Sequence, residues 1–298
     1  MKFYSPLRYP GGKSKLAPLI NLLISNADIQ NCTYIEPFAG GGGVALTLLL
    51  ENKVDRIIIN DYDCAVYAFW RAIKTDAKEL CRLVTTTPIT IDEWHKQRHI
   101  YNISHKYSVE LAFATLFLNR TNRSGILTGG PIGGYEQAGE WKLDVRFDRE
   151  AIAERILAIA SRKNSIVVYN KDIISLVDKY IPRYSENAFI YFDPPYYNKG
   201  QKLYKNFFSP DDHRRIAERI NNHISCPWVI TYDNVPEIRM LYHGYEIRQF
   251  DLTYSAANKG TASEIIICSK PEMYPSAQEM IKNGIQLNIR PQGEENDN

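Results

Sequence analysis

Four consecutive glycines, Gly40 to Gly43, stand between two apolar segments and restrict what the first part of the chain can fold into. Thr33 to Glu36 is a short apolar segment ahead of them, and Val44 to Glu51 behind them has the character of a helix. Val54 to Asn60 is rich in the β-branched residues of a buried strand. Strand, glycine-rich turn, helix and strand in this order predict a βαβ unit and, with it, a parallel sheet.

The same alternation of strands and helices returns in the second half of the chain. Strands are expected at Ser165–Tyr169, Ala188–Phe192 and Trp228–Tyr232. Helices are expected at Ser14–Ile24, Cys64–Lys74, Ile173–Tyr180 and Val235–Tyr242, and from an N-cap at Ser209 to Ile224. Tyr245–Phe250 and Glu264–Cys268 are expected to pair antiparallel around the loop Thr253–Thr261. The predicted fold class is therefore α/β, with a Rossmann-like sheet.

Residues 75–150 interrupt this alternation. They hold a helical stretch, Val109–Leu118, and then a polar loop from Asn119 to Glu140 that is dense in glycine. A long irregular loop in a compact chain is usually functional or disordered. We therefore expect an α/β domain made of residues 1–65 and 151–275, a mainly helical domain inserted at residues 66–150, and a C-terminal tail at residues 276–298. The tail is expected to be disordered from about Arg290.

The composition is that of an ordinary globular protein, with 298 residues of which 44% are hydrophobic and 23% charged. No apolar run is long enough to span a bilayer, and the start lacks the apolar core of a signal peptide. Five scattered cysteines indicate neither a disulfide framework nor a zinc site, which favours a reducing cytoplasm. His95 and His99 could share a helix face, but no metal site is expected there because no acids or cysteines accompany them.

A net charge of +2 is too small to imply nucleic acid, so the distribution of charge is more informative. Basic residues gather in the inserted segment at Arg120, Arg123, Lys142, Arg146 and Arg149. A local basic cluster can bind phosphates whatever the global balance, or it can be a solvated charged face. Charge alone leaves both readings open.

Residues 189–197 read Phe-Ile-Tyr-Phe-Asp-Pro-Pro-Tyr-Tyr, an apolar strand that delivers one carboxylate into a stiff loop. Each proline fixes its own φ and biases the residue before it toward an extended backbone. Asp193, Pro194, Pro195 and Tyr196 are therefore expected in one fixed arrangement. Such a loop offers oxygen acceptors for amine hydrogens and a ring for stacking, which suits chemistry on a flat, aminated ring. An ordinary Asp-Pro turn is the alternative.

The glycine run also fits the G-x-G-x-x-G/A pattern, in which glycines let a ligand approach backbone amides at a helix N-terminus. Asp61 follows at the distance of an acid that holds ribose hydroxyls. This pattern does not choose among dinucleotides, flavins and S-adenosylmethionine (SAM). Gly11-Gly12-Lys13-Ser14 is not a phosphate loop, because the Walker pattern needs a glycine where Leu7 stands. This segment is either a plain loop that leads into the first helix or a turn that points Lys13 and Tyr9 into a site.

Taken together, five ordered motifs resemble those of the Dam-type (alpha-group) DNA adenine N6-methyltransferases. They are Tyr-Pro-Gly-Gly-Lys at 9–13, Glu-Pro-Phe-Ala-Gly-Gly-Gly at 36–42, Asn-Asp-Tyr at 60–62, Leu-Asn-Arg at 118–120 and Phe-Asp-Pro-Pro-Tyr at 192–196. The resemblance spans residues 3–269, and the inserted segment falls where that family carries its target-recognition domain. It implies a Rossmann-like, SAM-dependent enzyme that methylates N6 of an adenine flipped out of double-stranded DNA.

The resemblance implies roles for single residues as well. The SAM pocket would be formed by Tyr9, Lys13, Glu36, Pro37, Phe38, Gly40 and Gly42, with Asp61 on the ribose, Asp172 on the SAM adenine and Asp193 shared with the target base. The target base and the catalysis would fall to Asp193, Pro194, Pro195 and Tyr196. DNA would be contacted by Arg8, Asn119, Arg120, Arg123 and Ser124. The resemblance implies no metal.

The chain departs from the best-known members just after Leu-Asn-Arg. Those enzymes carry an aromatic-Asn-Gly-Leu stretch there, whereas residues 121–126 read Thr-Asn-Arg-Ser-Gly-Ile. Arg123 takes the place of the aromatic wedge, so recognition of GATC is not implied. Arginine is well suited to read guanine in the major groove, which makes Arg123 a candidate base contact. A contact to phosphate alone is the alternative.

Two other functions remain open at this point. An amino-methyltransferase could act on cytosine N4, RNA adenine or a glutamine amide through a related Pro-Pro-aromatic loop, although Asp rather than Ser or Asn before the prolines favours DNA adenine. A non-catalytic DNA-binding homologue is the second alternative, and the intact Asp193 and Lys13 argue against it. A cognate restriction endonuclease is a candidate partner, and a nucleoid-associated, cytoplasmic location is expected.

Overall fold

The computed structural model describes residues 3–8, 13–197, 208–253 and 261–291, and the chain divides into two compact units. The first unit comprises Met1–Ser14, Ala39–Asn52 and Arg56–Lys171, and the second comprises Lys15–Phe38, Lys53–Asp55 and Asp172–Asn298. The chain therefore passes between the units several times. The domain boundaries predicted from the sequence follow chain order instead, and they remain a prediction.

The first unit contains a parallel pair of strands. β2 (Arg56–Asn60) pairs with β3 (Ile166–Tyr169), and Ile57 faces Ile166 in the register. The helix α2 (Gly43–Leu50) contacts β2 and buries every residue from Val44 to Leu49. The predicted order of glycine turn, helix and buried strand is therefore confirmed.

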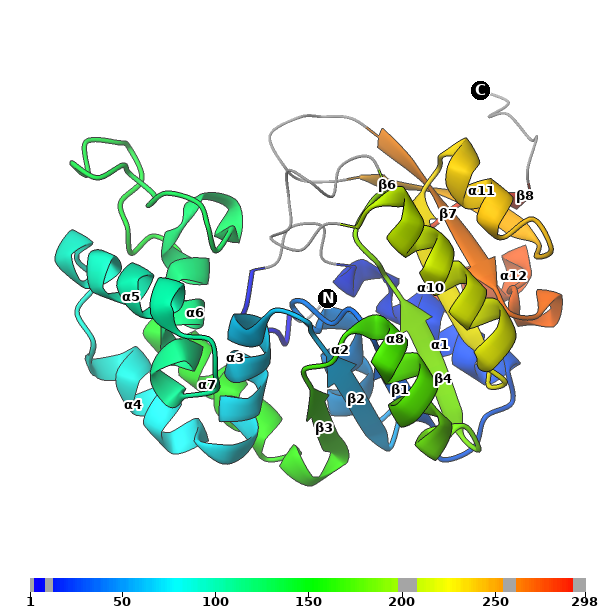
Figure 1. Ribbon diagram of the computed structural model, residues 1–298, viewed down its shortest axis with the longest axis horizontal. Helices are drawn as coiled ribbons and strands as arrows, with labels where there is room; N and C mark the ends of the chain where they lie inside the picture. The colour runs from blue at the N-terminus through cyan, green and yellow to red at the C-terminus, as the bar shows by residue number, and fades with distance from the viewer. Residues whose placement is uncertain (1–2, 9–12, 198–207, 254–260, 292–298) are drawn as a thin grey trace. The chain divides into compact units, whose positions relative to one another are not determined.

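The second unit contains a mixed sheet. Its strands follow the order β1 (Thr33–Glu36), β4 (Ala188–Phe192), β5 (Trp228–Asp233), β7 (Thr261–Cys268), β6 (Ile247–Thr253) and β8 (Ile289–Pro291). The pairs β1–β4 and β4–β5 are parallel, whereas β5–β7, β7–β6 and β6–β8 are antiparallel. All residues of β1 and β4 are buried, as is typical of strands covered on both faces. The predicted α/β class and the closing antiparallel pair are confirmed (Figure 1).

Helices and turns of the second unit connect these strands. They are α1 (Ala17–Asn26) after the 3-10 turn η1 (Ser14–Leu16), α8 (Ile173–Ser175), the π-helical turn η4 (Leu176–Tyr180), η5 (Ile181–Tyr184), α10 (Pro210–His223), α11 (Pro236–Leu241), η6 (Pro271–Met273) and α12 (Ala277–Lys282). α10 begins at the predicted N-cap. The Ser209 side chain accepts from the Asp212 amide, and the Asp212 carboxylate accepts from the Ser209 amide, so both ends of a capping box are satisfied.

Ordered structure also occurs in the segment predicted as a tail. α12 starts at a second capping box, formed by Ser276 and Glu279. β8 pairs with β6 and places Arg290 opposite Gln249, so the prediction of disorder from about Arg290 is wrong for this residue and for Pro291, where β8 ends. The Ser-x-x-Glu signature of the capping box was the available sequence signal for α12.

The inserted segment is helical, as predicted. It contains most of α3 (Cys64–Thr75), α4 (Ala77–Thr86), α5 (Ile91–Ile103), α6 (Val109–Thr121) and the 3-10 turn η2 (Arg123–Gly125). At its end α7 (Arg149–Ala160) begins, and η3 (Lys163–Ser165) follows. Residues 111–121 of α6 are all buried, and α6 contacts α3, α4 and α5. α6 is therefore the central helix of this group, whose members are drawn from blue through cyan to green in Figure 1.

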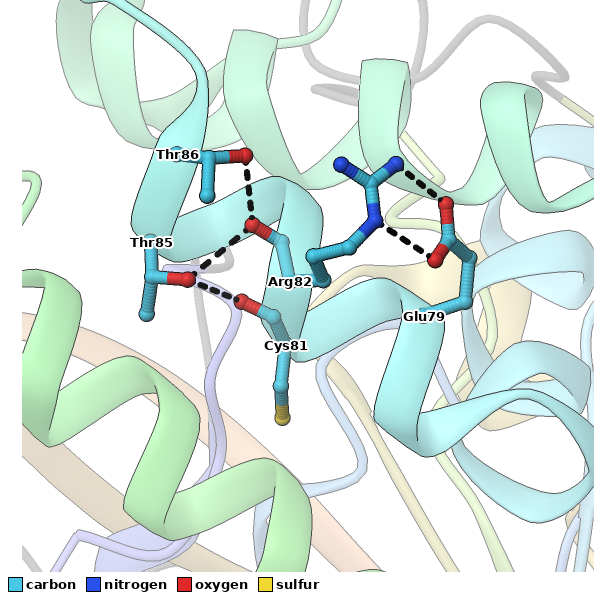
Figure 2. A network of polar contacts seen from close by, with 5 residues as sticks. All are labelled: Glu79, Cys81, Arg82, Thr85 and Thr86. Carbon is cyan, nitrogen blue, oxygen red and sulfur yellow. Dashed lines mark hydrogen bonds and ion pairs between the residues drawn. The ribbon is translucent and has the colours of Figure 1, made fainter.

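The end of α4 is stabilised by its own side chains (Figure 2). Thr85 donates to the Cys81 carbonyl at 3.0 Å, and Thr86 donates to the Arg82 carbonyl at 2.8 Å. Arg82 pairs with Glu79 one turn earlier. Threonine hydroxyls in a helix commonly bond back to the carbonyl four residues earlier, so these bonds satisfy the hydroxyls themselves.

Two negative observations complete the fold. Within the described ranges, no helix is long and apolar enough to cross a membrane. The five cysteines are free thiols, and burial raises the pKa of Cys226 to about 11. Buried thiols of this kind are poor nucleophiles.

Candidate active site

The glycine turn of the first unit is tied to the end of β2. The Gly40 amide donates to Asp61 Oδ2 at 2.9 Å, and the Ala39 amide donates to the Asn60 carbonyl at 2.9 Å. From α3, Trp70 Nε1 donates to the Gly40 carbonyl at 2.9 Å. The turn and the acid that the sequence analysis associated with it are therefore in direct contact.

Glycine is required at this turn for steric reasons. Gly42 has a φ of 58°, and a Cβ atom built on Gly43 would lie 2.0 Å from Ser14 Oγ. The segment that carries Lys13 therefore packs directly on the glycine turn. Lys13 itself is only 6% exposed. Tyr9, also predicted to line the pocket, lies outside the described residues.

Asp61 is half-buried and held by two amides, those of Gly40 and Asp63. Desolvation raises the pKa of the Asp61 carboxyl to about 7, and repulsion from the Asp63 carboxylate acts in the same direction, while the two amide donors oppose them. Because desolvation and repulsion disfavour the charged form of Asp61, a further hydroxyl donor would stabilise the carboxylate.

Glu36, Pro37, Phe38 and Asp172 belong to the second unit. Glu36 ends β1, is 6% exposed, and accepts a hydrogen bond of 2.9 Å from the Tyr34 hydroxyl. Pro37 is buried, and the Phe38 ring meets the Phe208 ring edge-on. Asp172 is exposed and caps α8 by accepting from the Ser175 amide at 2.9 Å.

The loop at residues 193–197 follows β4 and is called the catalytic loop after the role that the sequence predicts for it. Asp193 is half-buried and accepts a 3.0 Å hydrogen bond from Thr231 Oγ1, while Pro194 is buried. The Tyr196 hydroxyl donates to Glu264 Oε1 at 2.8 Å, and the Tyr197 amide donates to Asp233 Oδ1 at 2.9 Å. The predicted stiffness of this loop therefore has a second source besides proline.

Two of the residues predicted to contact DNA are buried instead. The Asn119 side chain accepts from the Arg8 amide at 2.7 Å and donates to the carbonyls of Arg8 and Gly125. Arg120 is 8% exposed and donates to the Pro6 carbonyl. Desolvation, followed by repulsion from Arg155 and Arg8, lowers the pKa of Arg120 to about 10. These two side chains hold the N-terminal segment to α6.

Arg123 and Ser124 are exposed near the start of the loop at residues 122–131, which is called the recognition loop after the role that the sequence predicts for it. Ser124 has a φ of 56°, and a Cβ atom on Gly125 would lie 2.4 Å from the Arg8 carbonyl oxygen. Arg8 is half-buried, and desolvation lowers its pKa. Among the residues predicted to contact DNA, Arg123 and Ser124 are thus the ones that face solvent.

The backbone of the recognition loop is fixed from α5. Trp94 Nε1 donates to Asn122 Oδ1 at 2.7 Å, and Asn122 Nδ2 donates to the Ile126 carbonyl at 2.8 Å. Arg98 donates to the Leu127 carbonyl at 2.6 Å and lies over the Trp94 ring. Sequence reasoning missed Trp94 and Arg98 because they precede the loop by about one helix and carry no motif.

Among the residues that the structure describes, no group of three or more His, Cys, Asp or Glu side chains is placed to hold a metal ion. His95 instead stacks on the Tyr135 ring, with centroids 5.9 Å apart.

Comparisons with known proteins come from families, curated relatives and solved structures. The family model described as "D12 class N6 adenine-specific DNA methyltransferase" matches residues 9–256. "Type II methyltransferase M.MjaIII" of Methanocaldococcus jannaschii is 24% identical over 265 residues, covering 82% of this chain and 89% of that protein. "Type II methyltransferase M1.LlaDCHI" of Lactococcus lactis subsp. cremoris is 22% identical over 282 residues, covering 87% and 93%.

Solved structures resemble the chain only weakly. The rRNA methyltransferase aviRa from Streptomyces viridochromogenes covers 89% of this chain and 88% of its own, with 10% sequence identity and a TM-score of 0.36. A likeness of that degree supports no argument about the fold, which rests on the strand order described above.

Proposed function

Because the chain belongs to the family of D12 class N6 adenine-specific DNA methyltransferases, we propose how its residues move a methyl group from SAM to an adenine of double-stranded DNA. The family methylates the exocyclic amine of adenine in DNA and uses SAM as the methyl donor. The proposal concerns the residue roles, the duplex substrate and the partners.

The residues around the glycine turn fit SAM. Gly42 and Gly43 let Trp70 and Ser14 pack closely on the turn, and the Asp61 carboxylate lies at the same turn. Asp61 accepts the ribose hydroxyls, Asp172 meets the adenine of SAM, and Lys13 with Glu36, Pro37 and Phe38 lines the methionine end. SAM supplies an electrophilic methyl group on a sulfonium when it is bound.

Asp193 carries the catalysis in this proposal. The lone pair of an adenine amine is delocalised into the ring, so the amine is a poor nucleophile. The Asp193 carboxylate and the Pro194 carbonyl accept the two amine hydrogens and thereby localise the lone pair. The amine becomes cationic as it attacks, and the carboxylate stabilises that charge. Positioning supplies most of the remaining rate enhancement, and no covalent intermediate with the enzyme forms.

Tyr196 holds the base from its face. An adenine inside the duplex is out of reach, so it must be flipped out at a cost of about a few kcal/mol. Stacking on an aromatic ring offsets about 1–3 kcal/mol of this cost. Pro195, between the two functional residues, restricts the backbone that sets their separation.

DNA is read by the exposed residues at the start of the recognition loop. Arg123 and Ser124 are the exposed members of the predicted set, and an arginine fork matches the O6 and N7 acceptors of guanine. Asn119 and Arg120 act indirectly, by holding the segment that ends at Arg8 against the loop. Both curated relatives are named type II methyltransferases, which supports a restriction endonuclease as partner of this chain.

The observation that carries the proposal is the half-buried Asp193 carboxylate, oriented by Thr231 at the end of buried β4. The test is methyl transfer from labelled SAM to duplex DNA, followed by single-molecule sequencing of DNA from a host that expresses the protein. Label in N6-methyladenine at one short sequence is expected. Label confined to cytosine, or to RNA, would refute the proposal.

A further inference from the structure

Glu264 is a buried carboxylate in an apolar strand. It is 1% exposed and lies in the middle of β7, directly before the fully buried Ile265, Ile266 and Ile267. Burying a carboxylate is costly unless it is paired or hydrogen-bonded. An apolar residue would serve the packing of β7 better, so the position of Glu264 calls for a reason outside the core.

The register of the sheet shows what surrounds this carboxylate. Glu264 pairs with Asp233 of β5, so two acids stand opposite each other on one face. Like charges directly opposite are destabilising in a sheet. Both acids accept hydrogen bonds from the catalytic loop, Glu264 from the Tyr196 hydroxyl and Asp233 from the Tyr197 amide. The loop thus contributes the donors that offset the repulsion.

Thr231 completes the arrangement on the same face of β5, two residues before Asp233. It donates to Asp193 and has a single hydroxyl hydrogen, so the 2.8 Å contact with Tyr191 must be donated by the tyrosine. Three side chains of two neighbouring strands therefore hold three points of a five-residue loop.

The bond to Glu264 decides how freely the Tyr196 ring can move. The phenol oxygen is the far end of the ring, while the backbone next to it is fixed at Tyr197. With both ends held, the ring is kept in one χ1 rotamer and therefore in one position, although the phenol oxygen lies on the χ2 axis and so leaves rotation about χ2 free. A ring ordered in advance does not lose that freedom when a base arrives.

We propose that Glu264 is a positioning residue, which holds the hydroxyl of Tyr196 so that the ring is a preformed stacking surface for the flipped adenine. This inference rests on the stacking role proposed for Tyr196. Immobilising one such side chain costs about 0.5–1.5 kcal/mol, so the preformed ring corresponds to about a 2- to 12-fold gain in base capture.

The test uses the full-length protein and a duplex in which the methylated adenine, located by sequencing, is replaced by 2-aminopurine. The fluorescence of 2-aminopurine reports the fraction of duplexes in which the base is flipped out. If Glu264 had only a structural role, this fraction would not change. Tyr196→Phe keeps the ring and loses the hydroxyl, and we expect the flipped fraction to fall about 2- to 12-fold. Glu264→Leu should give the same loss, and Glu264→Gln, which keeps an acceptor oxygen, should restore most of it.

A double variant and a control separate positioning from folding. The flipped fraction should fall no further in the double variant Tyr196→Phe with Glu264→Leu than in either single variant, because both changes remove the same hydrogen bond. Tyr274→Phe is the matched control, since the Tyr274 hydroxyl donates to the Ile266 carbonyl of the same strand without touching the loop. It should leave the flipped fraction unchanged.

The outcomes distinguish the positioning role of Glu264 from the stacking role of Tyr196 on which it rests. If Tyr196→Ala reduces the flipped fraction while Tyr196→Phe does not, stacking stands and the role of Glu264 is overturned. If neither change has an effect, the stacking role itself fails. If Glu264→Leu does not fold, the Tyr196→Phe result still decides the matter.

Discussion

The catalytic loop and the recognition loop are both held by side chains from neighbouring elements, but at different kinds of groups. In the catalytic loop, bonds from Thr231 and to Glu264 end on the functional side chains, Asp193 and Tyr196. In the recognition loop, bonds from Arg98 and Asn122 end on backbone carbonyls, and Arg123 remains exposed. A reaction that is the same in every turnover needs fixed reacting side chains. Recognition of DNA needs only a fixed loop backbone, from which an exposed side chain can adjust to the base.

The largest effect is expected in the catalytic loop, whose functional side chains are held in place. Asp193→Asn keeps the shape but replaces the carboxylate, so the cation that develops on the amine loses its counter-charge. We expect kcat to fall by at least about 10²–10³-fold, with DNA affinity nearly unchanged. Rates of methyl transfer and fluorescence anisotropy on the same duplex measure the two quantities. Turnover near that of the wild type would remove Asp193 from the mechanism.

The next largest effect is expected in the recognition loop, where Arg123 is exposed. Arg123→Ala should cost about 1–3 kcal/mol of discrimination at one base pair, or about 5- to 150-fold, and relax the recognised sequence there. Asn122→Ala is the comparison variant, because it releases the backbone rather than a reading group. It should weaken binding to all sequences alike. If Arg123→Ala instead lowers affinity uniformly with a smaller salt slope, the residue contacts phosphate.

A smaller effect is expected when a side chain behind the catalytic loop is changed. Thr231→Val has the same shape and removes the donor to Asp193. Loss of a hydrogen bond to a charged group is worth about 1.5 kcal/mol or more, so kcat should fall about tenfold while SAM affinity stays constant. Glu79→Gln, in the exposed pair on α4, is the surface control and should change neither quantity. A Thr231→Val enzyme with unaltered kcat would show that prolines alone orient the carboxylate.

The smallest effect concerns pH and the first unit. The pKa of Asp61 is about 7 in the folded chain against 3.8 as its ordinary value. Between these values the folded chain holds more protons than the unfolded one, so the free energy of unfolding decreases as pH rises. Asp61→Asn removes this slope, and in urea titrations without SAM it should stabilise the protein more at pH 8 than at pH 4. An equal difference at both pH values would contradict the raised pKa.

The parts of the molecule that could be predicted are those whose signal is local. β1 and β4 have the predicted bounds because short apolar runs end at Glu36 and at Asp193. The glycine turn and Asp61 were predicted together because the motif spacing reflects one crossover. The contact between them is confirmed.

The parts that could not be predicted depend on register and on packing between distant segments. Thr231 and Asp233 reach the catalytic loop because β5 pairs with β4, and Glu264 reaches it because β7 pairs with β5; no local motif in the sequence reveals these registers. Arg120 carries the charge expected of a DNA contact, yet its guanidinium satisfies a backbone carbonyl of the N-terminal segment. Charge in a sequence does not say which surface a side chain faces.

The left-handed backbone at Ser124 has a consequence for redesigning the recognised sequence. A residue with a φ of 56° is best replaced by Gly, Asn or Asp, since β-branched side chains are strained there. Gly125 tolerates no side chain, because a Cβ atom would collide with the Arg8 carbonyl. A library that aims to change specificity should therefore vary position 123 fully, position 124 among a few small polar residues, and position 125 not at all.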